Sequence, residues 1–501
     1  MKKTVNDFIK VLEDRNLIVS YSKLSDKKVS SITYNSKEAG EGTLFVCKGA
    51  HFQEKYLDDA IQSGAVCYIS EKKHFKATDE CVEIIVSDIR QAMPIIAETF
   101  HGRLSDKITM IGITGTKGKS TTAYFMRYIL DDYMLSSGGN RTAICSGIDN
   151  YDGVIEEESH LTTPEIMELY LHMKNAINNQ IRYMTMEVSS QALKYGRVDG
   201  IDFEVGCFLN IGTDHISEIE HSDFEDYFHS KLKLFEKCRN MCVNLDCDGQ
   251  NELKEALKKS PTVITFSQKN EKANVYGYDI KSHEGKVFFK VNISGVRGYK
   301  DIITEFTLGT FGTINIENAL AAVSMSAVLG IPIECIKSGL AKAISPGRME
   351  VFYSDDGNKI AVVDYAHNKL SYEKFFETIK DEFPGKEIII VFGCPGGKAF
   401  ARREELGTIA GERCVYSIIT EEDAGEEDVN KICKEIAGYV KKAGGKCEII
   451  TDRVEAIKKA IALMDDNNML FIPGKGRETR QKRGIEYIDT LSDAEVVQKY
   501  L

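Results

Sequence analysis

The residues with the clearest chemical meaning stand at 114–121, which read Thr-Gly-Thr-Lys-Gly-Lys-Ser-Thr. An apolar run, 108–113, precedes them, and a helical pattern, 122–130, follows. Glycines let backbone N–H groups curl around an anion, and the start of a helix adds partial positive charge. Lys119 can reach terminal phosphates, and Ser120 can ligate Mg²⁺. The segment predicts a site for ATP or GTP rather than a plain turn, although its glycine spacing departs from the strict phosphate-loop motif.

Three further residues are candidates for metal or phosphate chemistry. Glu187 follows a predicted buried strand, where a carboxylate can bind Mg²⁺ or simply be solvated. His215 stands beside Asp214 after another apolar run, and a ligand role and a structural role stay equally open for it. Lys231 lies in a helical pattern and, taken alone, would be a surface lysine equivalent to Lys233.

Two turns and one acidic run could bind a charged ligand. The turns, 394–398 and 474–478, each place a lysine among small residues near a predicted strand end. They could bind a carboxylate or phosphate, or be tight turns with a solvated lysine. Residues 420–428 carry six carboxylates in nine positions. Charge runs are usually solvated, but this one follows a predicted buried strand. If it faces a ligand, that ligand should carry a cationic group.

Composition limits the class of protein. The 501 residues exceed one core and predict several domains. A net charge of −12 argues against nucleic acid as the main partner. The 13 cysteines are scattered without a Cys-x-x-Cys pair, which predicts reduced thiols rather than disulfides or zinc. With no signal peptide and no apolar run of about 18 residues, we expect a cytoplasmic protein without membrane insertion.

The elements that must position these residues fall into three blocks, 1–104, 105–345 and 346–501. The first mixes short strands and helices. The second has strands of the buried parallel type and a β-rich stretch, 273–306. The third alternates strands with helical patterns, which predicts a doubly wound α/β domain. Because ligands collect beyond the carboxyl ends of strands in such sheets, the polar clusters at strand ends suggest one cleft shared between domains.

Taken together, these motifs resemble the Mur ligases of peptidoglycan synthesis, and among them the MurE type, over nearly the whole chain. The phosphate loop has the Mur form, which accounts for its glycine spacing. The resemblance implies three domains: an N-terminal α/β domain that binds the uridine nucleotide, a central ATPase-like domain with a phosphate loop, and a C-terminal Rossmann-like domain. Members of this type add the third amino acid to UDP-N-acetylmuramoyl-L-Ala-D-Glu through an acyl phosphate, with ATP and Mg²⁺. A monomer is expected.

The resemblance also implies residue roles. Lys119, Glu187, His215 and Lys231 would be catalytic. The ATP contacts would be Gly115, Thr116, Lys117, Gly118, Lys119, Ser120, Thr121, Asn315, Asn318, Arg348 and Asp364. The UDP-muramoyl dipeptide would contact Ser36, Thr162, Thr163, Ser189 and Arg197. The incoming amino acid would contact Lys398, Glu422, Asp423, Ala424, Gly425, Gly474 and Glu478. The metal ligands would be Ser120, Glu187, His215 and Lys231, the last as a carbamate.

Departures from the family pattern concern substrate contacts. The family usually has Asp-Ser-Arg where Asn35 and Lys37 flank a serine, His where Gln191 stands, and His where Arg477 stands. These changes leave the ATP machinery intact. Two rivals are a different Mur-fold amide ligase, such as a folylpolyglutamate synthase, and a catalytically silent nucleotide-binding homologue. Retention of both sets of metal ligands disfavours the second.

The third amino acid is predicted from the segment 422–425. Members that add meso-diaminopimelate have Asp-Asn-Pro-Arg there, and the arginine pairs with the distal carboxylate. Here the stretch reads Glu-Asp-Ala-Gly, so Gly425 replaces that arginine, and Lys398 replaces a second one. Loss of a bidentate arginine removes specific carboxylate recognition, and acidic neighbours repel a carboxylate. We therefore expect L-lysine, with L-ornithine or meso-diaminopimelate as alternatives.

Overall fold

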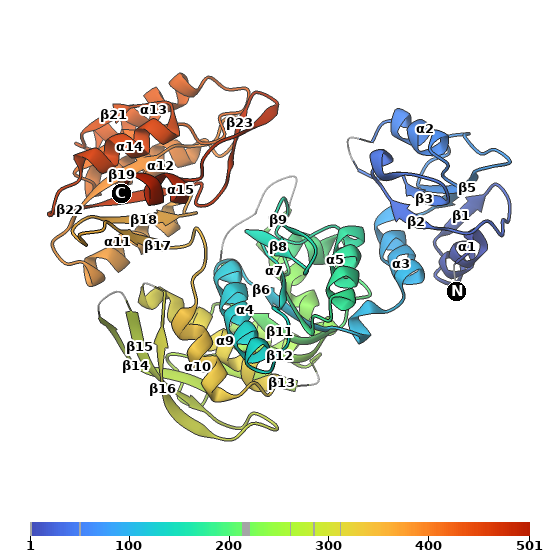
Figure 1. The fold of residues 1–501 in the computed structure, drawn as a ribbon, viewed down its shortest axis with the longest axis horizontal. Helices are drawn as coiled ribbons and strands as arrows, with labels where there is room; N and C mark the ends of the chain where they lie inside the picture. Colours follow the sequence, from blue (N-terminus) through green and yellow to red (C-terminus); the bar gives the residue numbers. More distant parts are fainter. Residues whose placement is uncertain (1–2, 50–51, 213–220, 261, 284–285, 311) are drawn as a thin grey trace. The chain divides into compact units, whose positions relative to one another are not determined.

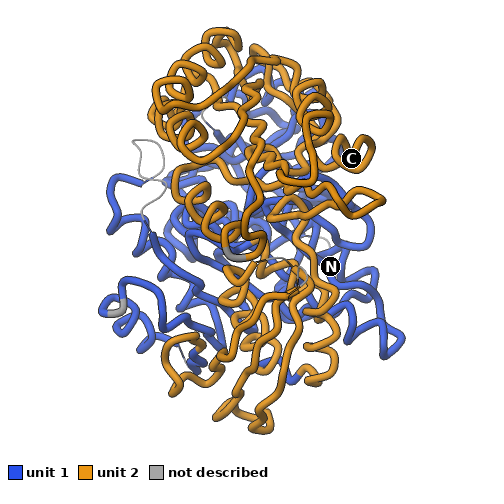
Figure 2. The backbone as a smooth tube through the Cα atoms, turned by 90° about the vertical axis from the view of Figure 1, so that its left-hand side faces the viewer, with its two compact units in different colours: residues 1–119, 130–265, 328–330 blue, residues 120–129, 266–327, 331–501 orange. Residues whose placement is uncertain are grey.

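The computed structural model describes residues 3–49, 52–212, 221–260, 262–283, 286–310 and 312–501. Contacts along the backbone divide the chain into two compact units, coloured separately in Figure 2. Unit 1 comprises residues 1–119, 130–265 and 328–330. Unit 2 comprises residues 120–129, 266–327 and 331–501. The domain boundaries expected near residues 104 and 345 stay predictions.

The amino-terminal part of unit 1 is built on a five-stranded sheet in the order β1-β5-β4-β3-β2 (Figure 1). The strands are β1 (Ile18–Tyr21), β2 (Ser31–Thr33), β3 (Thr43–Val46), β4 (Cys67–Ser70) and β5 (Val82–Val86), and the helices are α1 (Val5–Asp14), α2 (Glu54–Gln62) and α3 (Ile89–His101). Strands β2 to β5 are parallel, and β1 runs antiparallel to β5. Alternate residues of β3 face opposite sides: Leu44 joins the core with α1 and α3, and Phe45 the core with α2.

The remainder of unit 1 carries the phosphate loop on a second sheet. Its parallel strands follow the order β12-β11-β6-β10-β7, and β8 and β9 extend it antiparallel. These strands are β6 (Thr109–Thr114), β7 (Ala143–Cys145), β8 (Asp149–Tyr151), β9 (Glu156–Glu158), β10 (Tyr183–Glu187), β11 (Phe203–Phe208) and β12 (Cys238–Asn244). The helices of this region are α5 (Ile166–Asn178), α6 (Ser190–Lys194), α7 (Phe224–Leu232) and α8 (Gln250–Leu257). Helix α4 (Lys119–Ser136) is divided between the units, because its residues 120–129 are assigned to unit 2.

Unit 2 begins with the stretch expected to be β-rich. Strands β14 (Val275–His283), β15 (Lys286–Ile293) and β16 (Ile302–Leu308) form an antiparallel meander after β13 (Thr262–Ser267). Two helices follow, α9 (Ile316–Val328) and α10 (Ile333–Lys342). Helix α9 is buried along nearly its whole length, as its alanine-rich sequence allows.

The carboxyl-terminal part of unit 2 is a six-stranded sheet in the order β17-β18-β22-β19-β20-β21. Only β17 is antiparallel to its neighbour. The strands are β17 (Glu350–Tyr353), β18 (Ile360–Asp364), β19 (Glu387–Phe392), β20 (Tyr416–Ile419), β21 (Cys447–Ile449) and β22 (Asn468–Pro473). The helices are α11 (Lys369–Glu382), α12 (Ala401–Arg413), α13 (Val429–Lys442), α14 (Arg453–Leu463) and α15 (Asp493–Tyr500), and a hairpin of β23 (Arg480–Arg483) and β24 (Glu486–Asp489) precedes α15.

This sheet is covered by helices on both faces, as predicted for a doubly wound domain. Ile390 and Phe392 of β19 pack in a core with α11, α12 and α13. Ile389 and Val391 of the same strand pack in a second core with α14 and α15. Strands buried on both faces need apolar residues at every position, which is why β19 reads as a continuous apolar run.

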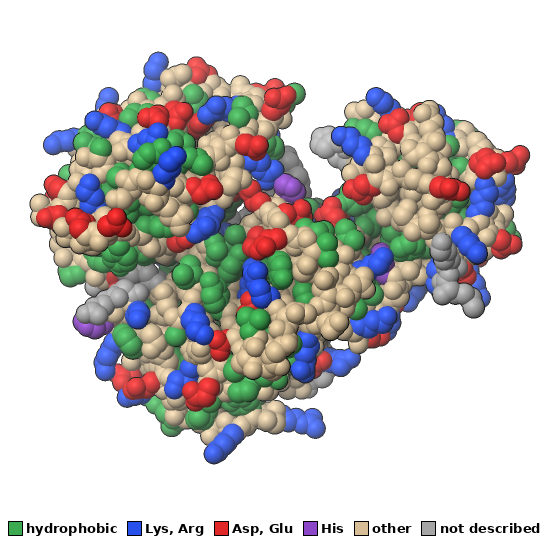
Figure 3. All heavy atoms as spheres, viewed as in Figure 1, with side chains coloured by type: hydrophobic (Ala, Val, Ile, Leu, Met, Phe, Trp, Pro, Cys, Tyr) green, Lys and Arg blue, Asp and Glu red, His purple; other side chains and the backbone are tan. Residues whose placement is uncertain are grey.

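The predicted fold class, an α/β protein with parallel sheets and a Rossmann-like carboxyl-terminal part, is confirmed. The first block mixes short strands and helices as expected, and the third alternates strands with helices. Acidic and basic side chains are interspersed on the face shown in Figure 3. In the part of the chain that the structure describes, every helix is too short or too polar to cross a membrane.

Candidate active site

The phosphate loop lies between β6 and α4 in a conformation that depends on its glycines. Gly115 and Gly118 have φ values of +157° and +86°, which other residues rarely adopt. A Cβ atom on Gly115 would lie 2.9 Å from the Cβ atom of Leu209. Because Gly118 directly precedes α4, the first backbone N–H groups and the positive end of the helix lie at the loop. The loop is therefore shaped to hold an anion.

Hydrogen bonds from Asn210 and Tyr227, which lie far from the phosphate loop in sequence, hold this loop in place. The Oδ1 atom of Asn210, just after β11, accepts the backbone N–H groups of Thr116 at 3.1 Å and Lys117 at 2.9 Å. The Tyr227 hydroxyl of α7 lies 3.0 Å from the Thr116 hydroxyl. Sequence reasoning did not assign these roles to Asn210 and Tyr227. The position of Asn210 at a strand end was the one available signal.

The ammonium of Lys119 rests on the loop itself. Its Nζ atom donates to the carbonyl oxygens of Gly115 at 3.0 Å and Thr116 at 3.2 Å. Both acceptors are neutral, whereas a phosphate oxygen carries charge and forms a stronger bond. An incoming phosphate would therefore compete well for this ammonium.

Lys231 is buried against the phosphate loop, so the expectation of a surface lysine is wrong. The residue is 2% exposed, whereas its neighbour Lys233 is exposed. Its Nζ atom donates to the carbonyl oxygen of Gly115 at 2.9 Å and lies 4.5 Å from the centroid of the Tyr227 ring. A helical pattern alone does not distinguish the two lysines, because burial here comes from packing α7 on the loop. As an ammonium, Lys231 can only donate; as a carbamate, it would offer oxygen ligands.

Glu187 lies at the same edge of the sheet as the phosphate loop. It ends β10 and pairs with Ile113 of β6, directly before the loop. Its side chain is almost fully buried, and its Oε1 atom accepts the N–H of Gly147 at 2.6 Å. The Thr163 hydroxyl donates to the Glu187 carbonyl at 2.9 Å and accepts the N–H of Ser189 at 2.9 Å. The structure thus joins Glu187 to two of the predicted substrate residues.

Arg197 forms a second group with two residues that were not predicted. The carboxylate of Glu165, two residues after Thr163, accepts from Arg197 Nε at 3.0 Å and from Lys48 Nζ at 2.5 Å. One carboxylate therefore holds two cations, and an anionic substrate would compete with it for them. Ser36 begins a short 3₁₀ turn, Ser36–Glu38, whose preceding residue Asn35 accepts the N–H of Lys37 at 3.1 Å.

His215 lies outside the described residues, so its predicted role stays a prediction. A nearby histidine that was not predicted, His221, is fully buried. Its Nε2 atom lies 2.9 Å from the Ser190 hydroxyl, and its Nδ1 atom lies 3.3 Å from the Asp226 carboxylate. Burial lowers the pKa of His221. A neutral ring there joins the start of α6 to α7.

The residues predicted to contact the nucleotide from unit 2 fall into two groups. Ser120 and Thr121, at the start of α4, are buried. Nearby, Asn318 Oδ1 accepts the Thr122 hydroxyl at 3.3 Å, and Asn318 Nδ2 donates to Asn315 Oδ1 at 3.2 Å. The predicted pairing of Ser120 with Glu187 around one metal involves residues of both units and stays a prediction.

The other group lies at the start of the carboxyl-terminal part. Arg348 lies over the ring of Tyr365, 4.3 Å from its centroid. The Asp364 carboxylate accepts the N–H of Met349 at 2.7 Å and of Ala366 at 2.8 Å, while burial raises its pKa. Asp364 thus fixes the turn that carries Arg348.

Glu422 and Gly474 touch in the predicted amino-acid site. A Cβ atom on Gly474, whose φ is +114°, would lie 2.4 Å from Oε2 of Glu422. Burial raises the pKa of Glu422 to about 7, against the opposing effects of Arg453 and Lys475. A carboxylate that is costly to ionise when empty favours a cationic ligand beside it.

Three other carboxylates of the acidic run, 420–428, are already paired with cations from elsewhere in the domain. Glu421 accepts two bonds from Arg483, Glu427 two from Arg403, and Asp423 one from Lys475 at 3.0 Å. That the run faces a cationic ligand stays a prediction, but these three carboxylates are already compensated inside the domain. Glu422 differs from these three because burial raises its pKa, and Glu426 is exposed.

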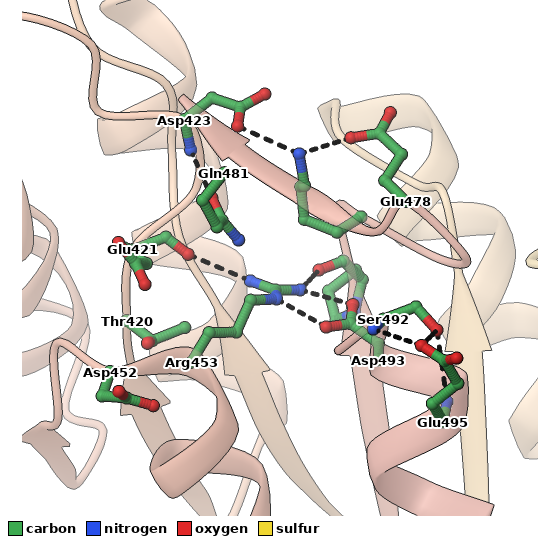
Figure 4. A network of polar contacts seen from close by, with 12 residues as sticks. Thr420, Glu421, Asp423, Asp452, Arg453, Glu478, Gln481, Ser492, Asp493 and Glu495 are labelled. Atoms are coloured by element: carbon green, nitrogen blue, oxygen red, sulfur yellow. Dashed lines mark hydrogen bonds and ion pairs between the residues drawn. The ribbon is translucent and has the colours of Figure 1, made fainter. Parts of the chain in front are cut away.

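Figure 4 shows how this run is anchored. Arg453 donates to both carboxylate oxygens of Asp493 at 2.7 Å and to the Glu421 carbonyl at 3.3 Å. The backbone N–H of Asp423 donates to Gln481 at 2.9 Å. Lys475 also pairs with Glu478. Burial disfavours the charge of Lys475, but Glu478 and Asp423 more than offset it and raise its pKa.

Gly425 forms backbone hydrogen bonds to the β23–β24 hairpin. With φ at +56°, its N–H donates to the Lys482 carbonyl at 3.0 Å, and its carbonyl accepts from Gly484 at 2.7 Å. Ala424 beside it is buried. Lys398, expected at the same site, is exposed. Gly425 therefore attaches residues 422–425, which we call the specificity segment, to the β23–β24 hairpin.

Comparison with known proteins shows the family to which the chain is similar. The Mur ligase middle domain matches residues 113–326, and the Mur ligase glutamate ligase domain matches residues 347–476. A UDP-N-acetylmuramoyl-L-alanyl-D-glutamate–L-lysine ligase of Enterococcus faecalis is 35% identical over 92% of this chain and 89% of its own. A ligase of the same name from Streptococcus pneumoniae is 36% identical over 95% of this chain and 92% of its own.

Solved structures show the same fold. A UDP-N-acetylmuramoyl-L-alanyl-D-glutamate–2,6-diaminopimelate ligase superimposes with a TM-score of 0.66 over 99% of this chain and 98% of its own, at 23% identity. That identity is low enough that the likeness speaks for the fold alone.

Proposed function

The chain belongs to the Mur ligase family, and we propose that it is an ATP-dependent amide ligase that adds L-lysine to the D-Glu γ-carboxylate of UDP-N-acetylmuramoyl-L-Ala-D-Glu. One observation supports the ligase chemistry most strongly. The phosphate loop, buried Glu187 and buried Lys231 gather at one edge of the parallel sheet in unit 1. Activation of a substrate carboxylate by ATP requires a loop that binds phosphate and residues that offset negative charge. Here the loop would bind the phosphate, and Glu187 and a carbamylated Lys231 would hold metal ions.

The reaction needs two steps whose atoms balance. The γ-carboxylate of D-Glu attacks the γ-phosphate of ATP. ADP departs, and the γ-phosphoryl group stays on the carboxylate as an acyl phosphate. The neutral α-amine of the incoming amino acid then attacks the acyl carbon, phosphate departs, and the nitrogen loses one proton to solvent as the amide forms. The loop amides and Lys119 would bind the transferred phosphate and offset the repulsion between two anions.

The residues also suit Mg²⁺, which screens phosphate charge when bound. The buried Glu187 carboxylate is a hard oxygen ligand, and Ser120 offers a hydroxyl; these would hold one ion. His215 and Lys231 would hold the second, provided that Lys231 is a carbamate. The amine donates to Gly115 as it stands, so carbamylation would exchange a repelling cation for an anionic ligand.

Lysine is proposed as the third amino acid on two grounds. Relatives at 35% and 36% identity are named L-lysine ligases. In addition, Glu422 offers an under-compensated carboxylate, and Gly425 stands where the diaminopimelate-adding members have an arginine. A terminal ammonium would relieve the desolvation of Glu422, whereas a distal carboxylate would meet no arginine at residue 425.

Phosphate release measured with ATP, Mg²⁺ and the UDP-muramoyl dipeptide tests the proposal. We expect release only when L-lysine is also present, together with a product heavier by one lysyl residue. The Lys119→Met variant serves as the control for contaminating phosphatases. No release with lysine, ornithine or diaminopimelate would overturn the ligase assignment.

A further inference from the structure

Two turns of the carboxyl-terminal part meet backbone to backbone. Gly347 and Gly476 have φ values of +64° and +59°. A Cβ atom on Gly347 would lie 3.0 Å from the backbone nitrogen of Arg477, and one on Gly476 would lie 3.2 Å from the Gly347 carbonyl oxygen. The first turn carries Arg348, a proposed nucleotide contact, and the second carries Glu478, a proposed amino-acid contact. Two segments assigned to different ligands therefore share one interface.

An ion pair closes this interface. Arg477 donates through Nε to Oε2 of Glu350 at 2.9 Å and through a terminal nitrogen to Oε1, which makes the contact bidentate. Glu350 is 8% exposed and also accepts the N–H of Gly347 at 2.8 Å. The hydrogen bond to Glu350 raises the pKa of Arg477. Histidine, which the family usually has at position 477, lacks this two-pronged geometry.

The same two turns are joined a second time through β18. The Asp364 carbonyl accepts the N–H of Gly474 at 3.0 Å, while the Asp364 carboxylate holds Met349. The next residue, Tyr365, lies under Arg348. Burial is the main cause that raises the pKa of the Tyr365 hydroxyl, and the nearby Glu478 carboxylate adds to it. A shift of either turn would therefore be felt by the other.

The turn 474–478 also contacts the specificity segment, residues 422–425. Lys475 bonds Asp423 at 3.0 Å, and Gly474 leaves the space that Glu422 occupies. A continuous series of contacts thus runs from Arg348 and Glu350 through Arg477 and Lys475 to Asp423.

We propose that Arg477 is a positioning residue that couples binding of the nucleotide to binding of the incoming amino acid. The inference rests on the proposed function, which supplies the two ligands. When the nucleotide fixes the turn 347–350, the bidentate pair fixes the turn 474–478 and with it the surroundings of Glu422. By linkage, the amino acid must tighten the nucleotide by the same factor.

Calorimetric titration with MgADP, in the presence and absence of saturating L-lysine, tests this coupling without turnover. In the wild-type protein we expect lysine to tighten ADP binding about fivefold or more. Arg477→Met, which keeps a long side chain but loses the pair, should lower this ratio by about twofold or more, while the links through Asp364 remain. Arg477→Lys, which keeps the charge without the paired N–H groups, should fall between them.

Arg483→Met is the matched control. Arg483 also forms a bidentate pair with a glutamate, Glu421, but that pair lies on the hairpin side of the specificity segment. This variant should weaken lysine binding and keep the ratio measured at saturating lysine. Circular dichroism of each variant checks folding.

The outcomes separate this inference from the proposed function. A wild-type ratio retained in Arg477→Met, or a ratio of one in an active wild-type enzyme, overturns the coupling and leaves the ligase assignment standing. A wild-type protein that makes no tripeptide product overturns the ligase assignment itself.

Discussion

Replacing Glu422 by glutamine should make the empty protein more stable at alkaline pH. Burial raises the pKa of Glu422 to about 7 from an ordinary 4.5. Between these values the folded state binds more protons than the unfolded state, so wild-type stability falls as pH rises through this window. At 1.36 kcal/mol per pKa unit, the full penalty is about 3 kcal/mol at about pH 8 and about 1 kcal/mol at about pH 5. Glutamine keeps the shape without the charge.

Urea unfolding of wild type and Glu422→Gln at both pH values measures this penalty. The difference in free energy of unfolding should grow by about 2 kcal/mol from about pH 5 to about pH 8. Glu426→Gln is the matched control, because Glu426 is an exposed acid of the same run and its loss should change stability by less than about 0.5 kcal/mol. Saturating L-lysine should narrow the gap at about pH 8, since its ammonium compensates the wild-type carboxylate. A difference that is the same at both pH values would show that the Glu422 carboxyl has no raised pKa in the folded protein.

Three other changes test neighbouring contacts. Gly474→Ala places a Cβ atom 2.4 Å from Glu422 at a φ of +114°, so we expect a loss of about 1–3 kcal/mol in urea unfolding and a higher KM for lysine; an unchanged KM would contradict the contact. Glu427→Gln should cost about 2 kcal/mol at pH 7, because the hydrogen bond from Arg403 lowers the Glu427 pKa to about 2. That cost should shrink as pH falls from about 4.5 towards 2, and a constant cost would argue against the pair. Lys231→Ala should lose phosphate release that bicarbonate cannot restore, and wild-type turnover in this variant would exclude the carbamate.

The phosphate loop could be predicted because its information is local. Glycines at a strand-to-helix junction allow the backbone conformation of residues 115–119, and they stand within a few residues of one another in the sequence. The doubly wound carboxyl-terminal part was equally readable, since continuous apolar strands alternate with helical patterns. Element type follows from periodicity within ten or so residues.

Lys231 shows where local information ends. Its helix was predictable, but Lys231 and Lys233 differ by burial alone, which depends on how α7 packs against a loop some hundred residues earlier. Without the family resemblance, periodicity could not have selected between them. Asn210 and Tyr227 were overlooked for the same reason.

The acidic run shows a second limit. From sequence, its six carboxylates look equivalent, yet cations from distant segments, Arg403, Lys475 and Arg483, neutralise three of them. Charge compensation across 24 to 62 positions leaves no periodic signal. We therefore centre the proposed cation site on Glu422 rather than on the whole run.

We propose that the protein is an amide ligase selective for L-lysine. The most direct test is the ratio of kcat/KM for L-lysine to that for meso-diaminopimelate, measured by phosphate release with ATP, Mg²⁺ and the UDP-muramoyl dipeptide. We predict a ratio of roughly 100 or more, because a diaminopimelate carboxylate would lose its arginine partner and meet Glu422 instead. Equal or more efficient use of meso-diaminopimelate would contradict the account.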